Sequence, residues 1–246
     1  MPGFDSIPAK PVQQFNTTHW TMVLKAQDTS SPDSEEALER LCRDYWRPLY
    51  YFARRKGNSP EDAQDLVQGY FAKLLEKKYL KDADRERGRF RTFLLSSFSH
   101  FMANEWDKQS RLKRGGAVPS LSIDAADAEG SFPLLPVEHF TPERLFDRAW
   151  AQTVVDTVFL KLREEFMERG EGERFHLLHP ALMGGELDGY KEIGAKIELS
   201  EAGVKTFVRR LRLRFRDLLR DELRHTLDDP LKVDEEIRHL LAALKS

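Results

Sequence analysis

The chain has 246 residues, 33% charged and 40% hydrophobic, with a formal net charge of −2, which suits one large or two small soluble domains. Its single cysteine, Cys42, excludes a disulfide framework and a cysteine-based zinc site within one chain. The N-terminal sequence lacks the basic start and apolar core of a signal peptide, and no apolar run is long enough for a membrane span. We therefore expect no membrane insertion and a cytoplasmic location.

Helical periodicity begins near residue 35, after an N-terminal extension of residues 1–34. A first helix is expected from there to Gly57, and Pro48 predicts a kink or a break inside it. Ser59 and Pro60 then start a second helix, with the serine as N-cap and the proline at the first helical position.

A third helix is expected from Phe90 to Lys113. Its apolar residues form a broad aromatic stripe, most of which we assign to the core: Phe90, Phe93, Leu94, Phe98, Phe101, Met102 and Trp106. Three consecutive amphipathic helices can bury such faces only against one another. Residues 35–114 are therefore predicted to form a compact helical domain.

Residues 115–141 have a different composition. They are rich in Gly, Pro and Ser, carry four acidic residues and contain no Lys or Arg. No helical period runs through them, so we interpret them as a flexible acidic linker. Helical signals return with a threonine cap and a proline at Thr141-Pro142, and a second domain is predicted over residues 142–225.

The second domain ends in a predicted helix-turn-helix. A short helix over residues 190–197 is followed by a break at Glu198-Leu199 and a long helix from Ser200 to Arg224. From Lys205 onward the long helix has eight basic residues against three acidic ones, mostly opposite an apolar face. Such a second helix can enter the major groove of DNA, although a basic face also simply keeps an amphipathic helix soluble. Residues 226–246 form a C-terminal extension with an amphipathic helix near residues 233–244. The predicted fold class is all-α: two small helical domains and a linker.

Three segments resemble the sigma-70 family of RNA polymerase sigma factors, in its extracytoplasmic-function (ECF) group. Residues 62–75, DAQDLVQGYFAKLL, resemble region 2, and residues 88–114 resemble the promoter-reading part that follows it. Residues 189–215, GYKEIGAKIELSEAGVKTFVRRLRLRF, resemble region 4. Sigma factors bind the polymerase core and direct it to promoters, so the resemblance implies both partners.

The resemblance implies that the second helix contacts the clamp coiled coil of the polymerase core. It also implies that the polymerase flap is a partner of the protein. The residues matched to this contact are Asp62, Asp65, Leu66 and Gln68. The alternative for these residues is a solvated helix face, with Asp62 favouring the helix dipole.

The resemblance also implies two DNA contacts. Region 2 would hold melted promoter DNA with Arg91, His100, Asn104, Lys108, Arg111 and Arg114. Region 4 would read duplex DNA with Ser200, Glu201, Lys205, Thr206, Arg209 and Arg210. Glu198 stands where the family usually has glycine. A left-handed Glu198 would cost about 1–2 kcal/mol, so Glu198→Gly is predicted to stabilise the turn.

The sequence thus predicts a transcription initiation factor that is monomeric when free, with no catalytic residues, metal or cofactor. An anti-sigma factor or another inhibitor remains open as a further partner. The alternative is a helix-turn-helix regulator with a helical dimerisation or sensor domain, which would form a stable dimer on a palindrome without polymerase.

Overall fold

The computed structural model describes most of the helical part of the chain. The described residues are 33–74, 89–112, 140–183, 189–224, 226–227 and 229–245. Nearly all of the predicted linker and the N-terminal extension lie outside them. The described residues are helical and contain no strand, which confirms the all-α prediction.

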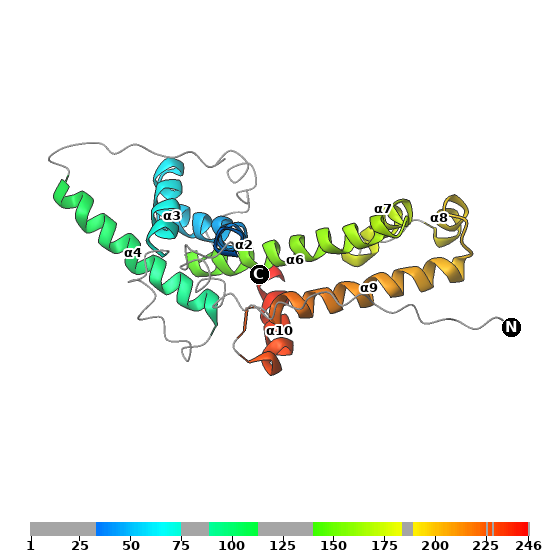
Figure 1. Ribbon diagram of the computed structural model, residues 1–246. Helices are drawn as coiled ribbons and strands as arrows, with labels where there is room; N and C mark the ends of the chain where they lie inside the picture. The colour runs from blue at the N-terminus through cyan, green and yellow to red at the C-terminus, as the bar shows by residue number, and fades with distance from the viewer. Residues whose placement is uncertain are drawn as a thin grey trace.

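The helices follow one another in the order shown in Figure 1. They are α2 (Asp33–Arg55), α3 (Pro60–Leu74), α4 (Phe90–Leu112), α6 (Pro142–Glu168), α7 (Gly172–Leu178), α8 (Tyr190–Lys196), α9 (Glu201–Arg224) and α10 (Val233–Lys245), with 3-10 turns at His179–Met183 and Pro230–Lys232. The predicted break at Pro48 is absent, because α2 continues through it.

Local capping signals start the helices where the sequence predicts them. The Asp62 backbone N–H donates to the Ser59 hydroxyl oxygen over 3.0 Å, and that hydroxyl donates to the Asp62 carboxylate over 2.8 Å. Thr141 caps α6 in the same way, accepting a hydrogen bond from the Arg144 N–H over 3.3 Å. Each cap satisfies a backbone N–H that has no partner within the helix.

The first three helices share an aromatic core. The Tyr70 ring lies edge-on to Phe98, with ring centroids 5.1 Å apart, and Tyr45 meets Phe90 in the same manner at 5.4 Å. The Tyr70 hydroxyl also donates to the Leu94 carbonyl oxygen over 3.3 Å. This bond satisfies a polar group that would be costly to bury alone, and it joins α3 to α4.

Two long helices, α6 and α9, run antiparallel beside each other and form an arm that carries α7 and α8 at its far end (Figure 1). Phe166 packs on Phe207 between them, with ring centroids 5.5 Å apart. The Arg214 Nε donates to Glu165 Oε2 over 2.8 Å. The arm is therefore joined along its length by apolar and ionic contacts.

The near end of the arm packs against α2, so both halves of the molecule share one core. Glu222 of α9 is buried at this junction and pairs with Arg40 of α2 at 3.2 Å and with Lys161 of α6. The Arg55 Nε donates to the Phe140 carbonyl oxygen over 2.9 Å. The division into two domains at residues 115–141 stays a prediction, but the domains it separates are in contact.

A buried carboxyl, Asp44 of α2, adjoins the same junction. The pKa of Asp44 is raised to about 6, mainly by burial and in second place by the nearby charge of Glu222. Two carboxyls close together in a low-dielectric site disfavour having both ionised. The junction thus contains a group that titrates well above the usual range of aspartate.

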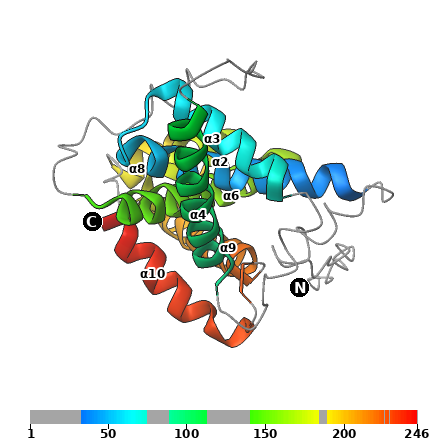
Figure 2. The same cartoon turned by 90° about the vertical axis from the view of Figure 1, so that its left-hand side faces the viewer.

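The C-terminal helix α10 packs across α6 and α9 near the beginning of α4 (Figure 2). Its Leu240 is buried in the shared core, and Val233 is buried as well. Glu236, from the first turn of α10, is 1% exposed. A carboxylate is rarely buried without cationic partners, and those partners are described below.

Candidate nucleic-acid and protein interfaces

The outer face of α3 is acidic and exposed. Asp62 and Asp65 are exposed, Leu66 and Gln68 are partly buried, and Val67 between them is in the core. Of the four predicted core-contact residues on this helix, the two aspartates are thus at the surface, and Leu66 packs partly against the core. Carboxylates near the N-terminus of a helix are stabilised by its dipole and can still meet a basic partner.

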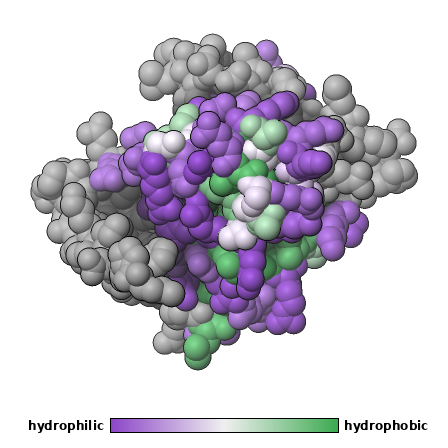
Figure 3. Space-filling model, turned by 90° about the vertical axis from the view of Figure 1, so that its right-hand side faces the viewer, coloured by the Kyte–Doolittle hydropathy of each residue, from purple (hydrophilic) through white to green (hydrophobic). Residues whose placement is uncertain are grey.

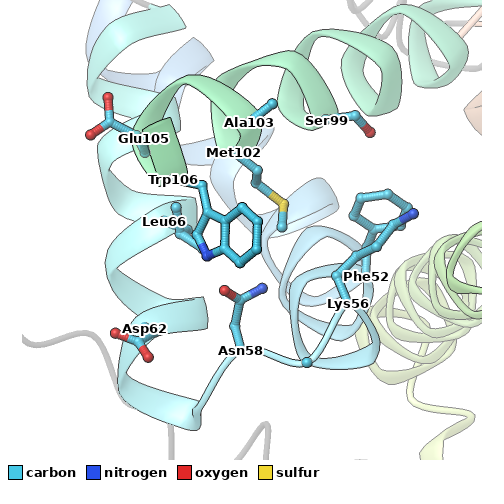
Figure 4. Close-up of a pocket in the computed structure, with 11 residues that line it drawn as sticks. Phe52, Lys56, Asn58, Asp62, Leu66, Ser99, Met102, Ala103, Glu105 and Trp106 are labelled. Atoms are coloured by element: carbon cyan, nitrogen blue, oxygen red, sulfur yellow. The ribbon is translucent and has the colours of Figure 1, made fainter. Parts of the chain in front are cut away.

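A cavity of about 640 Å³ opens beside this face, between α3, the end of α2 and the end of α4 (Figure 4). Trp106 forms one wall, opposite Asn58, and Leu66 and Met102 supply apolar surface. The Trp106 side chain is 77% exposed, although the sequence places it in a stripe assigned mostly to the core. An exposed tryptophan beside a cavity is a typical anchor for a protein partner.

The solvent-facing side of α4 carries a polar stripe that the sequence only partly predicts. His100, Asn104 and Lys108 are exposed and four residues apart, so they follow one another along one side of the helix. Thr92 and Ser96 extend the same spacing toward the start of α4. These side chains can donate to or accept from base edges and phosphates.

The segment from α8 to α9 forms two helices joined by a tight turn. Glu198 in that turn has φ 56°, which confirms the predicted left-handed conformation. Gly194 allows the turn to close, because a Cβ there would lie 2.4 Å from the Leu199 carbonyl oxygen. Ser200 then caps α9 by accepting from the Gly203 N–H over 3.1 Å.

Basic side chains cover the outer face at the beginning of α9. All six residues predicted to read duplex DNA are exposed: Ser200, Glu201, Lys205, Thr206, Arg209 and Arg210. Tyr190 of α8 and the basic residues of α9 line a groove of about 540 Å³. Figure 3 looks onto this end of the molecule, where hydrophilic side chains surround a small hydrophobic patch.

The cations of this face differ in the partners they have. Lys205 pairs with Glu201 at 2.6 Å, and hydrogen bonding within this pair lowers the pKa of Glu201 and raises that of Lys205. Arg210 donates to both oxygens of Glu171 over 2.9 and 3.0 Å. Arg209 has no ion pair within the described part of the chain, so its guanidinium is available for an external anion.

Comparison with known proteins finds a family match for the segment that contains α3 and α4. Residues 41–112 match the family described as Sigma-70 region 2. This segment is similar to sigma-70 region 2. No curated protein and no solved structure matches the chain. The match supports a sigma-70 family sigma factor and, with it, binding to RNA polymerase core and promoter DNA.

The region 2 match extends from Leu41 in α2 to the end of α4 and contains the acidic α3 face, the Trp106 cavity and the polar stripe. It lies within the domain predicted over residues 35–114. The Arg111 side chain and Arg114, both predicted to hold DNA, fall outside what the structure describes.

One predicted DNA contact of region 2, Arg91, is not at the surface. The residue is 8% exposed, and its guanidinium stacks on the Trp150 ring of α6 at 4.3 Å from the centroid. Arg91 also pairs with Glu236 of α10 and lies 3.5 Å from Asp147. Burial lowers the pKa of Arg91, an effect that the charge of Asp147 partly opposes. No pattern in the sequence indicates the burial of Arg91, because its partners come from distant segments.

The described residues include no group of three or more His, Cys, Asp and Glu side chains able to hold a metal ion. None of their helices is long and apolar enough to cross a membrane.

Proposed function

We propose that the chain is an RNA polymerase sigma factor of the ECF type, which binds core polymerase and directs it to promoters. The observation that carries this proposal is the region 2 match over α2, α3 and α4. Sigma factors position DNA while the polymerase carries out the chemistry, so the chain acts without catalytic residues of its own.

In this proposal the two exposed faces of region 2 have different partners. The acidic α3 face, with Asp62 and Asp65, docks on a basic helix pair of the polymerase clamp. The polar stripe of α4, with His100 and Asn104, contacts the melted strand of the promoter. The separation of the two faces on different helices supports this division of roles.

The segment from α8 to α9 acts as region 4, a helix-turn-helix that reads the distal promoter element and meets the polymerase flap. The left-handed turn at Glu198, the close approach at Gly194 and the exposed basic start of α9 support this assignment. A helix-turn-helix presents the first turns of its second helix to the major groove.

The cell compartment and the oligomeric state follow from the same proposal. A protein that loads onto RNA polymerase works in the cytoplasm, and this chain is monomeric before it meets the core. An anti-sigma factor or another inhibitor would hold it inactive by covering the α3 face or the α4 stripe.

Pull-down of purified core polymerase tests the proposal. Wild type is expected to capture core, and Asp65→Lys to lose most of that capture because it places a cation opposite a basic partner. The matched control is Glu164→Lys, which makes the same charge change at an exposed position of α6. Equal capture of core by both variants would show that Asp65 is not part of the contact.

Transcription by the reconstituted enzyme tests the function as a whole. Core polymerase supplied with the chain is expected to start at new sites on genomic DNA, and sequencing of the transcripts defines the promoter. No capture of core and no new start sites, together with a stable dimer on palindromic DNA, would instead establish an ordinary helix-turn-helix regulator.

A further inference from the structure

The start of α4 is covered by the acidic first turn of α10. This acidic turn consists of Asp234, Glu235 and Glu236. Arg89 pairs with Glu235 at 2.8 Å and with Glu236 at 3.0 Å, and Arg91 also pairs with Glu236. Two arginines are thus held by two carboxylates from a segment about 145 residues later in the chain.

This contact is a built interface and not a chance meeting of surface charges. Glu236 is 1% exposed and Arg91 is 8% exposed, whereas exposed ion pairs are weak and easily exchanged. Leu240 joins α10 to the shared core, α10 packs on α6 and α9, and Asp234 pairs with Arg220 of α9. The apolar anchor fixes the acidic turn over the arginines.

The covered arginines lie at the N-terminal end of the polar stripe of α4, with Arg89 in line with the stripe and Arg91 on the neighbouring side of the helix that faces α6 and α10. Arg89 lies three residues before Thr92, at the N-terminal end of that stripe. A nucleic-acid strand that follows the stripe from Asn104 through His100 and Ser96 would reach Arg89 and Arg91 next. Arginine is the side chain that best matches phosphate oxygens, and carboxylate is the group that most closely replaces phosphate in that pairing.

We propose that α10 is a built-in competitor of single-stranded DNA: its acidic turn occupies the Arg89–Arg91 pair that the phosphates of a melted strand would otherwise bind. This inference rests on the proposed function for the identity of its ligand. Release of α10 removes both carboxylate partners of Arg89 and one partner of Arg91, while Trp150 and Asp147 still hold Arg91. Strand binding and α10 docking therefore exclude each other at these two side chains.

Removal of the two carboxylates tests the competition. The double variant Glu235→Gln/Glu236→Gln keeps the shape of both side chains and removes their charge. It is expected to bind a fluorescent single-stranded oligonucleotide about tenfold more tightly than the control Glu164→Gln/Glu168→Gln, which neutralises two exposed acids of α6. The slope of log affinity against log salt concentration should steepen by roughly one unit, since each phosphate contact on a single strand contributes about 0.7 to that slope. Equal affinities of the two double variants would overturn the proposal.

A further variant shows whether the gain passes through the covered arginines. Addition of Arg89→Gln and Arg91→Gln to the Glu235→Gln/Glu236→Gln protein is expected to cancel most of the gain in strand affinity. A gain that survives both substitutions would mean that the carboxylates act by general repulsion, and the proposal would fall.

Hydrogen exchange of the wild-type protein gives a measurement that needs no variant. Saturating oligonucleotide is expected to accelerate amide exchange in α10, residues 233–245, while the amides of α6 keep their protection. Unchanged protection of α10 in the bound protein would contradict the competition. If the chain does not bind core polymerase but the double variant binds the strand more tightly through the two arginines, the proposed sigma function is wrong and the masking of the arginines by α10 is supported.

Discussion

Glu198 is the one non-glycine residue with positive φ among the described residues, and it sits in the turn that aims α9. A side chain in this conformation is strained, and glycine relieves the strain. We expect Glu198→Gly to raise the free energy of unfolding by about 1 kcal/mol, as measured by urea denaturation. The control, Ala195→Gly, removes a side chain from the exposed, right-handed end of α8 and should lower stability by a similar amount. A Glu198→Gly protein no more stable than wild type would show that the side chain is held there by compensating contacts.

Asp44 predicts a pH dependence at the junction between α2 and α9. Its folded pKa of about 6 lies above the ordinary value of 3.8, so the folded state favours the protonated form. The stability that Asp44 contributes is therefore present below about pH 4 and is lost as the pH rises through 6. Asp44→Asn removes this dependence, so its stability relative to wild type should rise by up to about 3 kcal/mol between pH 4 and pH 7.5. Urea denaturation of both proteins at the two pH values measures the change, and a pH-independent difference would contradict the assignment.

Trp106 shows why exposure at the end of a helix is hard to predict. The aromatic periodicity of α4 holds through Phe101, which is buried, and the same spacing places Trp106 on a related side of the helix. The α2 and α3 helices no longer cover α4 at that point, and a cavity lies there instead. Periodicity records which side of a helix is apolar, but not where the neighbouring helix ends.

The uncovered end of α4 leads to a prediction about binding to core polymerase. Trp106→Ala is expected to weaken binding to core polymerase by about 2 kcal/mol, a typical loss for a tryptophan anchor. Its free energy of unfolding should change by less than about 0.5 kcal/mol, because the side chain is exposed. Leu160→Ala, which removes an exposed apolar side chain of α6, is the control and should bind core normally. Unimpaired capture of core by Trp106→Ala would leave the cavity without a role in that interface.

The basic face of α9 predicts unequal contributions from its cations. Arg209→Ala should reduce the slope of log affinity for duplex DNA against log salt concentration by about one unit. The reason is that the Arg209 guanidinium has no ion pair within the described residues that DNA would have to displace. Lys205→Ala and Arg210→Ala should have smaller effects, since DNA must displace Glu201 or Glu171 from those cations. The control Arg163→Ala, at an exposed position of α6, should leave the slope unchanged. Equal effects of the three α9 variants would mean that the ion pairs do not compete with DNA.

The helices themselves could be predicted because their signals are local. Ser59, Thr141 and Ser200 each cap a helix from within three residues of the N–H they bind. The packing of those helices could not, because its determining contacts join distant residues. Arg91 and Glu236 are 145 positions apart, and Arg40 and Glu222 are 182 apart. No periodicity within one helix encodes such a pair, so the covering of a predicted DNA contact became visible only in the structure.

For the whole molecule, the shared core predicts that the free protein unfolds as one unit. Val67 of α3 and Val158 of α6 are both fully buried in that core, one in each half of the chain. Val67→Ala and Val158→Ala should each cost about 2 kcal/mol and lower the midpoint of a single thermal transition by about 5 °C. Differential scanning calorimetry measures the transition. Two separate transitions, each moved by only one of the variants, would show that the halves are thermodynamically independent.

The antiparallel arm also has a mechanical consequence. Its helix α6 has 27 residues and is therefore about 40 Å long, with the α8–α9 turn near its outer end. A tilt of about 5° where α6 rests on α2 moves that outer end by roughly 3.5 Å, close to the 3.4 Å rise of one nucleotide along a DNA strand. A small change in the angle between α6 and α2 thus shifts the α8–α9 turn by about one base pair.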